Sequence, residues 1–382
     1  MMNKVSTQDR PSPRIVNERN HGIDLFRVLL ALMVLSLHFN AGGTGKVLNN
    51  ATEVPWKWIA GGVTALCYPA VNCYVLISGF FMYKQKASLR KQMRSLSKLW
   101  LAILFYSLIG YIVVVTIFGK DFSWIELLRR FFPVSRGVWW FFTVYFALAI
   151  LSPFMNAMID ALDKAYHRML ILLLLIMCSI IPMFTNWEGQ LGSNYGYSLL
   201  WFFVLYVTGA YISRYISGLI KNSNRRKVSL AEVIVFFICS SIVFCSGPIL
   251  RKLGIALSPL APYNSLITYV QSISLLLFFM NVKVNEKFAK IIADISGLSL
   301  ASYMFHCQED INSVLWSNLK PWEYANSSMI IIVFLVTVVA LYTVSILIEF
   351  VRNMVVGMTG LDEIVGGLTD CILTRVIKAL NR

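Results

Sequence analysis

Ten apolar stretches of about 20 residues dominate the sequence and leave few folds open to it. They cover residues 23–40, 60–82, 99–118, 138–157, 169–186, 198–216, 229–247, 263–282, 292–311 and 327–350. Only 14% of the residues are charged, whereas soluble domains average about 25%. A soluble fold would have to bury every one of these stretches in a single core. The chain is therefore predicted to be an all-α, polytopic helical membrane protein with about ten transmembrane helices.

The distribution of basic residues predicts the orientation of these helices. With the amino terminus inside, the cytosolic segments hold 24 of the 34 lysine and arginine residues and the outer segments hold 9. Because short cytosolic loops are enriched in lysine and arginine, both termini are predicted to be cytosolic. The net charge of +15 is then explained by orientation and by contact with membrane lipids, and no nucleic-acid partner is expected.

Three regions follow from this topology. Residues 1–22 are predicted to be a polar cytosolic tail, because they lack the apolar core of a secretory signal. Residues 23–350 form the transmembrane domain, and residues 351–382 are predicted to be an amphipathic cytosolic tail that lies on the membrane. Between the third and fourth stretches, residues 119–137 resemble an interfacial amphipathic helix.

The seven cysteines give no sign of a disulfide framework or of a metal site. None belongs to a Cys-x-x-Cys pair, and all but Cys371 lie in apolar stretches. They are predicted to be small buried hydrophobic residues. No metal and no resident cofactor is expected.

The first stretch, Gly22 to Asn40, carries two ionisable residues in an otherwise apolar helix. Arg27 and His38 lie eleven residues apart, or about 16 Å along a helix. Ionisable residues within a membrane usually mark a functional site. Equally, Arg27 could reach the headgroups as an anchor, and His38 could be an interfacial histidine with its hydrogen bonds satisfied.

The ninth stretch carries a second histidine at a matching depth. His306 lies about as far from the start of its stretch as His38 does, and both stretches run outward. The two imidazoles are therefore expected in the outer half of the membrane, where they could face a shared cavity. Glu309 and Asp310 follow one turn later. They either orient His306 or merely mark the outer end of the helix.

Two polar residues accompany Arg27 in the inner half of the membrane. Asp24 lies three residues before Arg27, and the pair is interpreted as a local ion pair that makes burial of the arginine less costly. Ser78 lies inside the second stretch, where small polar residues often join helices. Tyr145 lies near the outer interface, where aromatic side chains are common anyway.

A basic stripe marks the cytosolic start of the third stretch. Arg90, Arg94 and Lys98 recur every four residues and so share one helix face. Such a stripe suits a phosphate-bearing ligand, and it suits anionic lipid headgroups equally well.

The chain lacks the sequence motifs of several common enzyme classes. It contains no Walker loop, Gly-x-Ser-x-Gly elbow, His-Glu-x-x-His motif or dinucleotide fingerprint. His21 and His167 fall in cytosolic segments next to basic residues, which leaves His38 and His306 as the histidines available for intramembrane chemistry.

The ordered set of motifs resembles the membrane acyltransferases of family three, which modify bacterial surface polysaccharides. The spacing Arg27-x10-His38, preceded by Asp24, resembles the signature of that family. Similar motifs follow in the same order over about residues 20–350: Ser78-Gly79-Phe80, Arg94, Trp140-Phe141 with Leu151-Ser152-Pro153, Trp201-Phe202 with Gly209-Ala210-Tyr211, and Ser302-Tyr303-Met304-Phe305-His306. Lys98 stands where many members carry a second arginine.

The resemblance implies O-acyl transfer, with an acetyl group passing from cytosolic acetyl-CoA to a sugar hydroxyl of a lipid-linked or cell-surface polysaccharide. It implies a multi-pass protein of the bacterial plasma membrane, with 23–350 as the acyltransferase domain. Catalysis is assigned to His38, Arg27 and His306. Donor binding falls to Arg27, Arg94 and Lys98, and substrate contacts fall to Tyr145, Asp24 and Ser78.

Two other classes of protein compete with this interpretation. A transporter or flippase for a glycan or small acid would also use about ten spans with polar residues at their centre. No inverted repeat and no matching pair of broken helices supports that class. A non-catalytic scaffold of a polysaccharide assembly would leave Arg27 and His38 without a role.

Overall fold

The computed structural model describes residues 19–41, 44–185, 189–222, 225–252 and 262–381, so most of the predicted tail 1–22 lies outside it. These residues form α-helices with short 3-10 and π-helical segments, and they contain no β-strand. The first nine helices are α1 (His21–Asn40), α2 (Val47–Asn50), α3 (Val54–Cys67), α4 (Ala70–Gln85), α5 (Leu89–Ile117), α6 (Trp124–Arg129), α7 (Trp140–Ala161), α8 (Lys164–Leu175) and α9 (Ile181–Phe184). The others are α10 (Leu199–Tyr211), α11 (Ser217–Asn222), α12 (Arg225–Lys252), α13 (Leu266–Asn281), α14 (Glu286–Leu298), α15 (Ala301–His306), α16 (Glu309–Leu319), α17 (Met329–Thr359) and α18 (Leu361–Leu380).

The predicted membrane architecture is confirmed. Within the described residues, nine helical segments are long and apolar enough to cross a membrane. The predicted eighth stretch forms α13, which is apolar but has only 16 residues. The protein is therefore a polytopic helical membrane protein.

Side-chain caps fix where several of these helices begin. Ser88 accepts a hydrogen bond from the backbone N–H of Lys91 at the start of α5, and Asp163 does the same for Tyr166 at the start of α8. Ser265 caps α13 in this way. Each cap satisfies a backbone donor that a helix leaves unpaired in its first turn.

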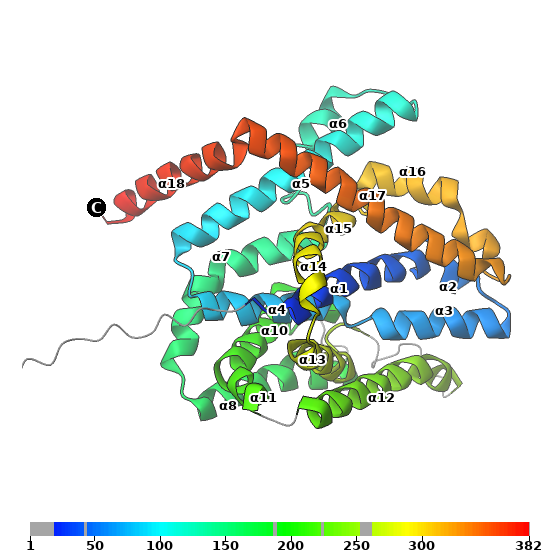
Figure 1. Cartoon of the computed structure of the whole chain (residues 1–382), viewed down its shortest axis with the longest axis horizontal. Helices are drawn as coiled ribbons and strands as arrows, with labels where there is room; N and C mark the ends of the chain where they lie inside the picture. The colour runs from blue at the N-terminus through cyan, green and yellow to red at the C-terminus, as the bar shows by residue number, and fades with distance from the viewer. Residues whose placement is uncertain (1–18, 42–43, 186–188, 223–224, 253–261, 382) are drawn as a thin grey trace, which may run out of the picture.

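The first helix, α1, lies in the middle of the molecule, where it packs against α3, α4, α13, α14 and α17 (Figure 1). Most of its side chains are buried, including Phe26, Leu30 and Leu35. Because α1 is enclosed by other helices, Arg27 and His38 have protein around them. This arrangement makes α1 the axis of the candidate site.

Small residues bring α4 and α10 into close contact. A Cβ atom added to Gly79 would lie 2.5 Å from the backbone oxygen of Tyr206, and one added to Gly209 would collide with the backbone of Leu76. Helices in membranes commonly associate through such small residues because their backbones can then approach closely. The contact holds α4 in place beside α1.

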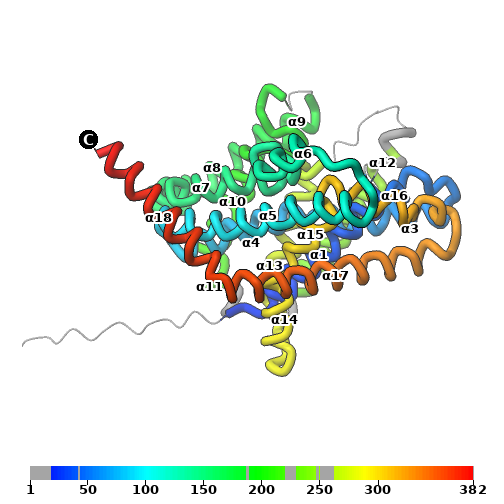
Figure 2. The backbone as a smooth tube through the Cα atoms, turned by 90° about the horizontal axis from the view of Figure 1, so that it is seen from above, coloured from blue at the N-terminus to red at the C-terminus, as the bar shows by residue number. Residues whose placement is uncertain are grey.

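Two of the predicted spans are broken. The second is divided into α3 and α4 at Tyr68–Pro69, where proline interrupts the helical hydrogen bonds. The expectation of one continuous ninth helix over 292–311 is wrong, because α14 ends at Leu298 and α15 starts at Ala301. Figure 2 shows α14 projecting from the bundle. Irregular backbone is tolerated at membrane depth where it lines a cavity.

The carboxyl-terminal helices differ from the predicted boundary at residue 350. Helix α17 continues to Thr359, and α18 follows directly after Gly360, whose φ of +65° lets the chain bend between the two helices. Helix α18 packs against α5 (Figure 1). Its outward face carries exposed apolar side chains such as Leu368 and Ile372, as a helix lying at a membrane surface would.

Candidate active site

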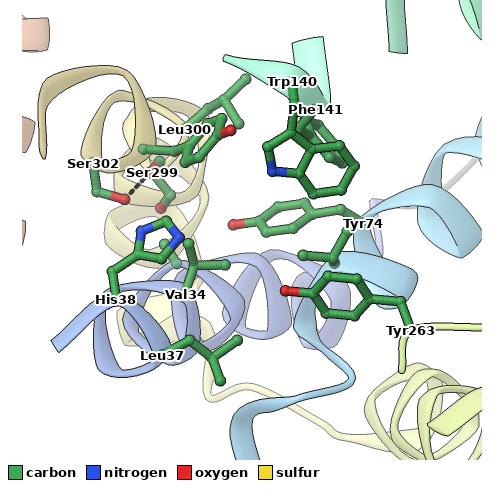
Figure 3. Close-up of a pocket in the computed structure, with 13 residues that line it drawn as sticks. Val34, Leu37, His38, Tyr74, Trp140, Phe141, Tyr263, Ser299, Leu300 and Ser302 are labelled. Atoms are coloured by element: carbon green, nitrogen blue, oxygen red, sulfur yellow. Dashed lines mark hydrogen bonds between the residues drawn. The ribbon is translucent and has the colours of Figure 1, made fainter. Parts of the chain in front are cut away.

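A cavity of about 40 Å³ lies beside His38, between α1, α4, α7 and the junction of α14 and α15 (Figure 3). Much of its wall is aromatic, formed by Tyr74, Trp140, Phe141, Tyr263 and Tyr303. The break between α14 and α15 reaches the cavity through Ser299 and Leu300. The volume has room for a few water molecules or for a small organic group.

One face of α1 borders this cavity. Arg27, Ala31, Val34 and His38 follow at intervals of four, three and four residues, which places them on the same side of the helix. Ala31, Val34 and His38 line the cavity. The face therefore carries a cation at one end and an imidazole at the other, with small apolar side chains between them.

His38 and His306 are in direct contact. Nδ1 of His38 lies 2.6 Å from Nε2 of His306, and the ring centroids are 4.9 Å apart. The other nitrogen of His306, Nδ1, donates to the backbone carbonyl of Ser302. A neutral His306 therefore offers Nε2 as an acceptor, which His38 fills with its Nδ1–H. Among the described residues, Nε2 of His38 has no hydrogen-bond partner, so it is free to act as a base.

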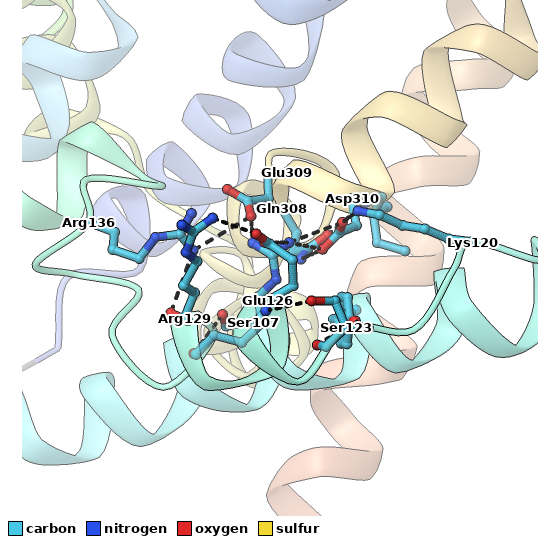
Figure 4. A network of polar contacts seen from close by, with 12 residues as sticks. Ser107, Lys120, Ser123, Glu126, Arg129, Arg136, Gln308, Glu309 and Asp310 are labelled. Carbon is cyan, nitrogen blue, oxygen red and sulfur yellow. Dashed lines mark hydrogen bonds and ion pairs between the residues drawn. The ribbon is translucent and has the colours of Figure 1, made fainter.

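The orienting group of His306 is thus a carbonyl and not a carboxylate. The alternative in which Glu309 or Asp310 orients His306 is wrong, because both carboxylates pair with Arg130 (Figure 4). The Arg130 side chain is only 2% exposed, and burial lowers the pKa of its guanidinium while Asp310 opposes that shift. This network ties the segment after α6 to the start of α16.

Arg27 keeps most of its hydrogen-bonding capacity unused. Its guanidinium lies 3.8 Å from Asp24 and 5.4 Å from the centre of the Phe81 ring. Among the described residues, its side chain makes no hydrogen bond. The hydroxyl of Tyr74, a residue of the cavity wall, donates instead to the backbone carbonyl of Arg27. Five N–H donors are therefore available for an anion.

Asp24 belongs mainly to a different ion pair from the one predicted. Its carboxylate accepts two hydrogen bonds from Arg19, at 2.7 and 3.1 Å, and one from Ser296 at 3.2 Å. Asp24 is buried and lies outside the cavity lining. The predicted local pair with Arg27 is present as well, at 3.8 Å, and it is longer than the contacts with Arg19.

Tyr145 and Ser78 lie next to each other and near Arg27 rather than on the cavity wall. The Tyr145 ring stacks on Phe141 at a centroid distance of 5.8 Å. Ser78 donates to the backbone carbonyl of Tyr74 at 2.8 Å. Tyr74, whose carbonyl accepts from Ser78, lines the cavity and so connects these residues to its wall.

Comparison with protein families decides the class of this protein. The family model for the acyltransferase domain of family three matches residues 20–349. The chain belongs to the membrane acyltransferases of family three. Comparison with curated proteins and with solved structures gives no match. The protein is therefore a membrane acyltransferase, and its predicted family membership is confirmed.

The basic stripe of this acyltransferase is already paired within the chain. Arg94 forms an ion pair with Asp370 of α18, and Lys98 lies 3.3 Å from Asp362. Arg90 donates to Thr374 at 3.1 Å. Helix α18 lies beyond the part of the chain that matches the family. All three basic side chains are more than half exposed, so these pairs are weak and replaceable.

Sequence reasoning missed several residues that the acyltransferase brings to the site. Tyr74 and Tyr263 come from separate segments, and no periodic pattern marks them as cavity residues. Trp140 lines the same cavity, a position that its motif alone did not indicate. Cys307 was grouped with buried apolar cysteines, yet its Sγ lies 3.2 Å from Nδ1 of His38. Its position directly after His306 was the available signal.

Proposed function

We propose that this acyltransferase transfers an acetyl group from cytosolic acetyl-CoA to a sugar hydroxyl of a lipid-linked or cell-surface polysaccharide, as a multi-pass protein of the bacterial plasma membrane. The proposal rests on one observation above all: the contact between His38 and His306 at the end of a helix face that starts at Arg27. The two ends of this face suit the two substrates of such a reaction.

The histidine pair would act as a proton relay. The Ser302 carbonyl fixes the tautomer of His306, and His306 in turn accepts the Nδ1 proton of His38. Nε2 of His38 then removes the proton from the sugar hydroxyl as its oxygen attacks the thioester carbonyl. The carbon–sulfur bond breaks, and the leaving CoA sulfur takes the proton back from His38. The products are the sugar ester and free CoA thiol.

Arg27 would hold the donor. A guanidinium with unused donors and little competing carboxylate binds phosphate or developing negative charge well. The aromatic wall of Tyr74, Trp140 and Tyr263 offers flat apolar faces, and tyrosine hydroxyls beside them, to a sugar ring.

Inside-out membrane vesicles carrying the chain and its native glycan test the proposal. Acetyl-CoA labelled in its acetyl group is supplied on the cytosolic face, and label is then measured in the glycan fraction. Label that depends on the chain supports the proposal. An unlabelled glycan fraction, in vesicles shown to contain acceptor, overturns it. A glycan that crosses the membrane without label would favour the transporter instead.

Arg27→Ala is expected to lower kcat/KM for acetyl-CoA by about tenfold or more, because a charge-assisted contact to the donor is lost. Arg27→Lys should recover only part of this loss, since an ammonium group lacks the planar fork of arginine. The measurement is the rate of acetyl transfer at varied acetyl-CoA. Unchanged kinetics in both variants would remove Arg27 from the donor site.

Helix α18 supplies a further prediction about donor binding. If Arg94 and Lys98 bind the phosphates of the donor, Asp370 and Asp362 compete for the same cations. The double variant Asp362→Asn/Asp370→Asn is then expected to lower KM for acetyl-CoA a few-fold. The matched control Glu363→Gln removes a charge elsewhere on α18 and should leave KM unchanged. A raised KM in the double variant would show that α18 supports the donor site.

A further inference from the structure

Three ligand atoms of the kind that zinc prefers converge at the histidine pair. Nδ1 of His38 lies 2.6 Å from Nε2 of His306 and 3.2 Å from Sγ of Cys307. All three atoms lie within 4.8 Å of one another. In the part of the chain that the structure describes, no other group of three histidine, cysteine or carboxylate residues converges in this way.

Two of the three separations are close to those of a metal-bound site. Zn–N distances near 2.0 Å and Zn–S distances near 2.3 Å in a tetrahedron place two nitrogens about 3.3 Å apart, and nitrogen and sulfur about 3.5 Å apart. The histidine nitrogens would have to separate by about 0.7 Å to reach that spacing. His306 and Cys307 lie at the end of α15, where the helix stops and side-chain adjustment of this size is easiest.

The surroundings of His306 already match those of a zinc-binding histidine. Histidines that bind zinc usually donate their other ring N–H to a carbonyl or carboxylate, which orients the ring. His306 does so through Nδ1 to the Ser302 carbonyl, and this leaves Nε2 directed at His38 and away from the backbone. Ser302 is itself held by the hydrogen bond from its hydroxyl to Ser299 at 2.9 Å.

Water can supply a fourth ligand. His38 borders the cavity, whose volume admits water as an additional ligand. Two neutral imidazoles and one thiolate would leave a bound divalent cation with one net positive charge. The neighbouring carboxylates cannot rearrange to neutralise it without leaving Arg130, which is buried.

From this geometry we propose that His38, His306 and Cys307 form a binding site for a divalent cation of the zinc class, and that its occupation stops acyl transfer. The inhibition rests on the proposed function, because the cation would displace the proton that His38 shares with His306. The relay cannot operate while both nitrogens are bound to the cation. The site itself depends only on the three ligand atoms.

Cobalt(II) tests the site independently of catalysis. The full-length chain in detergent is titrated with Co²⁺, whose absorption reports a thiolate ligand and tetrahedral geometry. We expect one equivalent of Co²⁺ to bind and to give a thiolate absorption band. Zn²⁺ should displace the bound Co²⁺, and a chelator should remove it. Cys307→Ser should weaken binding by roughly a hundredfold and abolish the band, since one of three protein ligands is lost. Cys371→Ser, a matched change of an exposed cysteine on α18, should bind as the parent does.

Acetyl transfer then tests the inhibition. For each variant the rate with Zn²⁺ is divided by the rate without it, so that changes in basal rate cancel. The parent and Cys371→Ser should be inhibited and recover with a chelator, whereas Cys307→Ser should resist. The absence of a thiolate band in the parent, or equal inhibition of Cys307→Ser, overturns the proposal. A normal cobalt titration without any acetyl transfer would leave the cation site in place and refute only the proposed function.

Discussion

His38→Ala is expected to lower acetyl transfer by about a thousandfold, which is the usual range for loss of a general base. The imidazole is the group that would take the hydroxyl proton. His306 cannot replace it, because His306 does not line the cavity in which the hydroxyl would lie. The measurement is label transferred from acetyl-CoA to glycan at equal amounts of membrane-inserted protein. His306→Ala should also reduce the rate, but less, since His38 would keep its own basic nitrogen.

His167→Gln provides the matched control for His38→Ala. His167 is fully buried and its Nε2 contacts the carbonyl of Val207 at 3.0 Å, but it lies outside the cavity lining. Loss of another buried imidazole should therefore leave kcat of the folded protein near that of the parent. Near-normal acetylation by His38→Ala would exclude His38 from the mechanism. An equal loss in both variants would indicate a general effect on folding.

Asp310→Ala is expected to destabilise the protein by about 3–5 kcal/mol, because it leaves the buried guanidinium of Arg130 without its best partner. Asp310 is also buried, and it accepts from Lys120 at 2.5 Å, from Gln308 at 3.0 Å and from Arg130 at 3.0 Å. Thermal unfolding in detergent should show Tm falling by about 10 °C. Glu126→Ala, which removes a half-exposed partner of Arg130 at 3.4 Å, should change Tm little.

The double variant Arg130→Met/Asp310→Leu distinguishes the effect of an unpaired buried charge on stability from the effect of lost packing. Replacement of a buried ion pair by apolar residues of similar size is often neutral or stabilising, so Tm should recover most of the loss. The network also matters for the site, since it fixes the start of α16, where Asn312 donates to the carbonyl of His306 at 2.9 Å. If the double variant unfolds as early as Asp310→Ala, the pair is not the source of the stability.

The sequence was sufficient to predict the helical spans, because the lipid bilayer around them imposes a helical conformation. A segment that crosses lipid must satisfy its backbone internally and present apolar side chains outward, so about 20 apolar residues leave little choice but a helix. The face of α1 that carries Arg27 and His38 could also be predicted, since eleven residues complete just over three full turns. Those features depend on local spacing alone.

Contacts between segments could not be predicted in this way. The proximity of His306 to His38 followed from a depth argument that assumed one continuous ninth helix, and the helix is in fact divided at Ser299–Leu300. Within α15 the Ser302 carbonyl accepts from Nδ1 of His306, and Cys307, directly after α15, lies beside the same nitrogen of His38 that His306 contacts. No sequence pattern marks a carbonyl as the partner of a ring nitrogen.

The sequence by itself determined the class of fold, the main helices and the two charged ends of α1, because hydropathy and helical periodicity are local properties. Only the tertiary structure decided which partner each charge has. Asp24 makes its shorter contacts with Arg19 and a longer one with Arg27, and the basic stripe of α5 meets α18. Electrostatic pairing acts over a few ångströms in space whatever the separation along the chain, so it is settled only when the helices have packed.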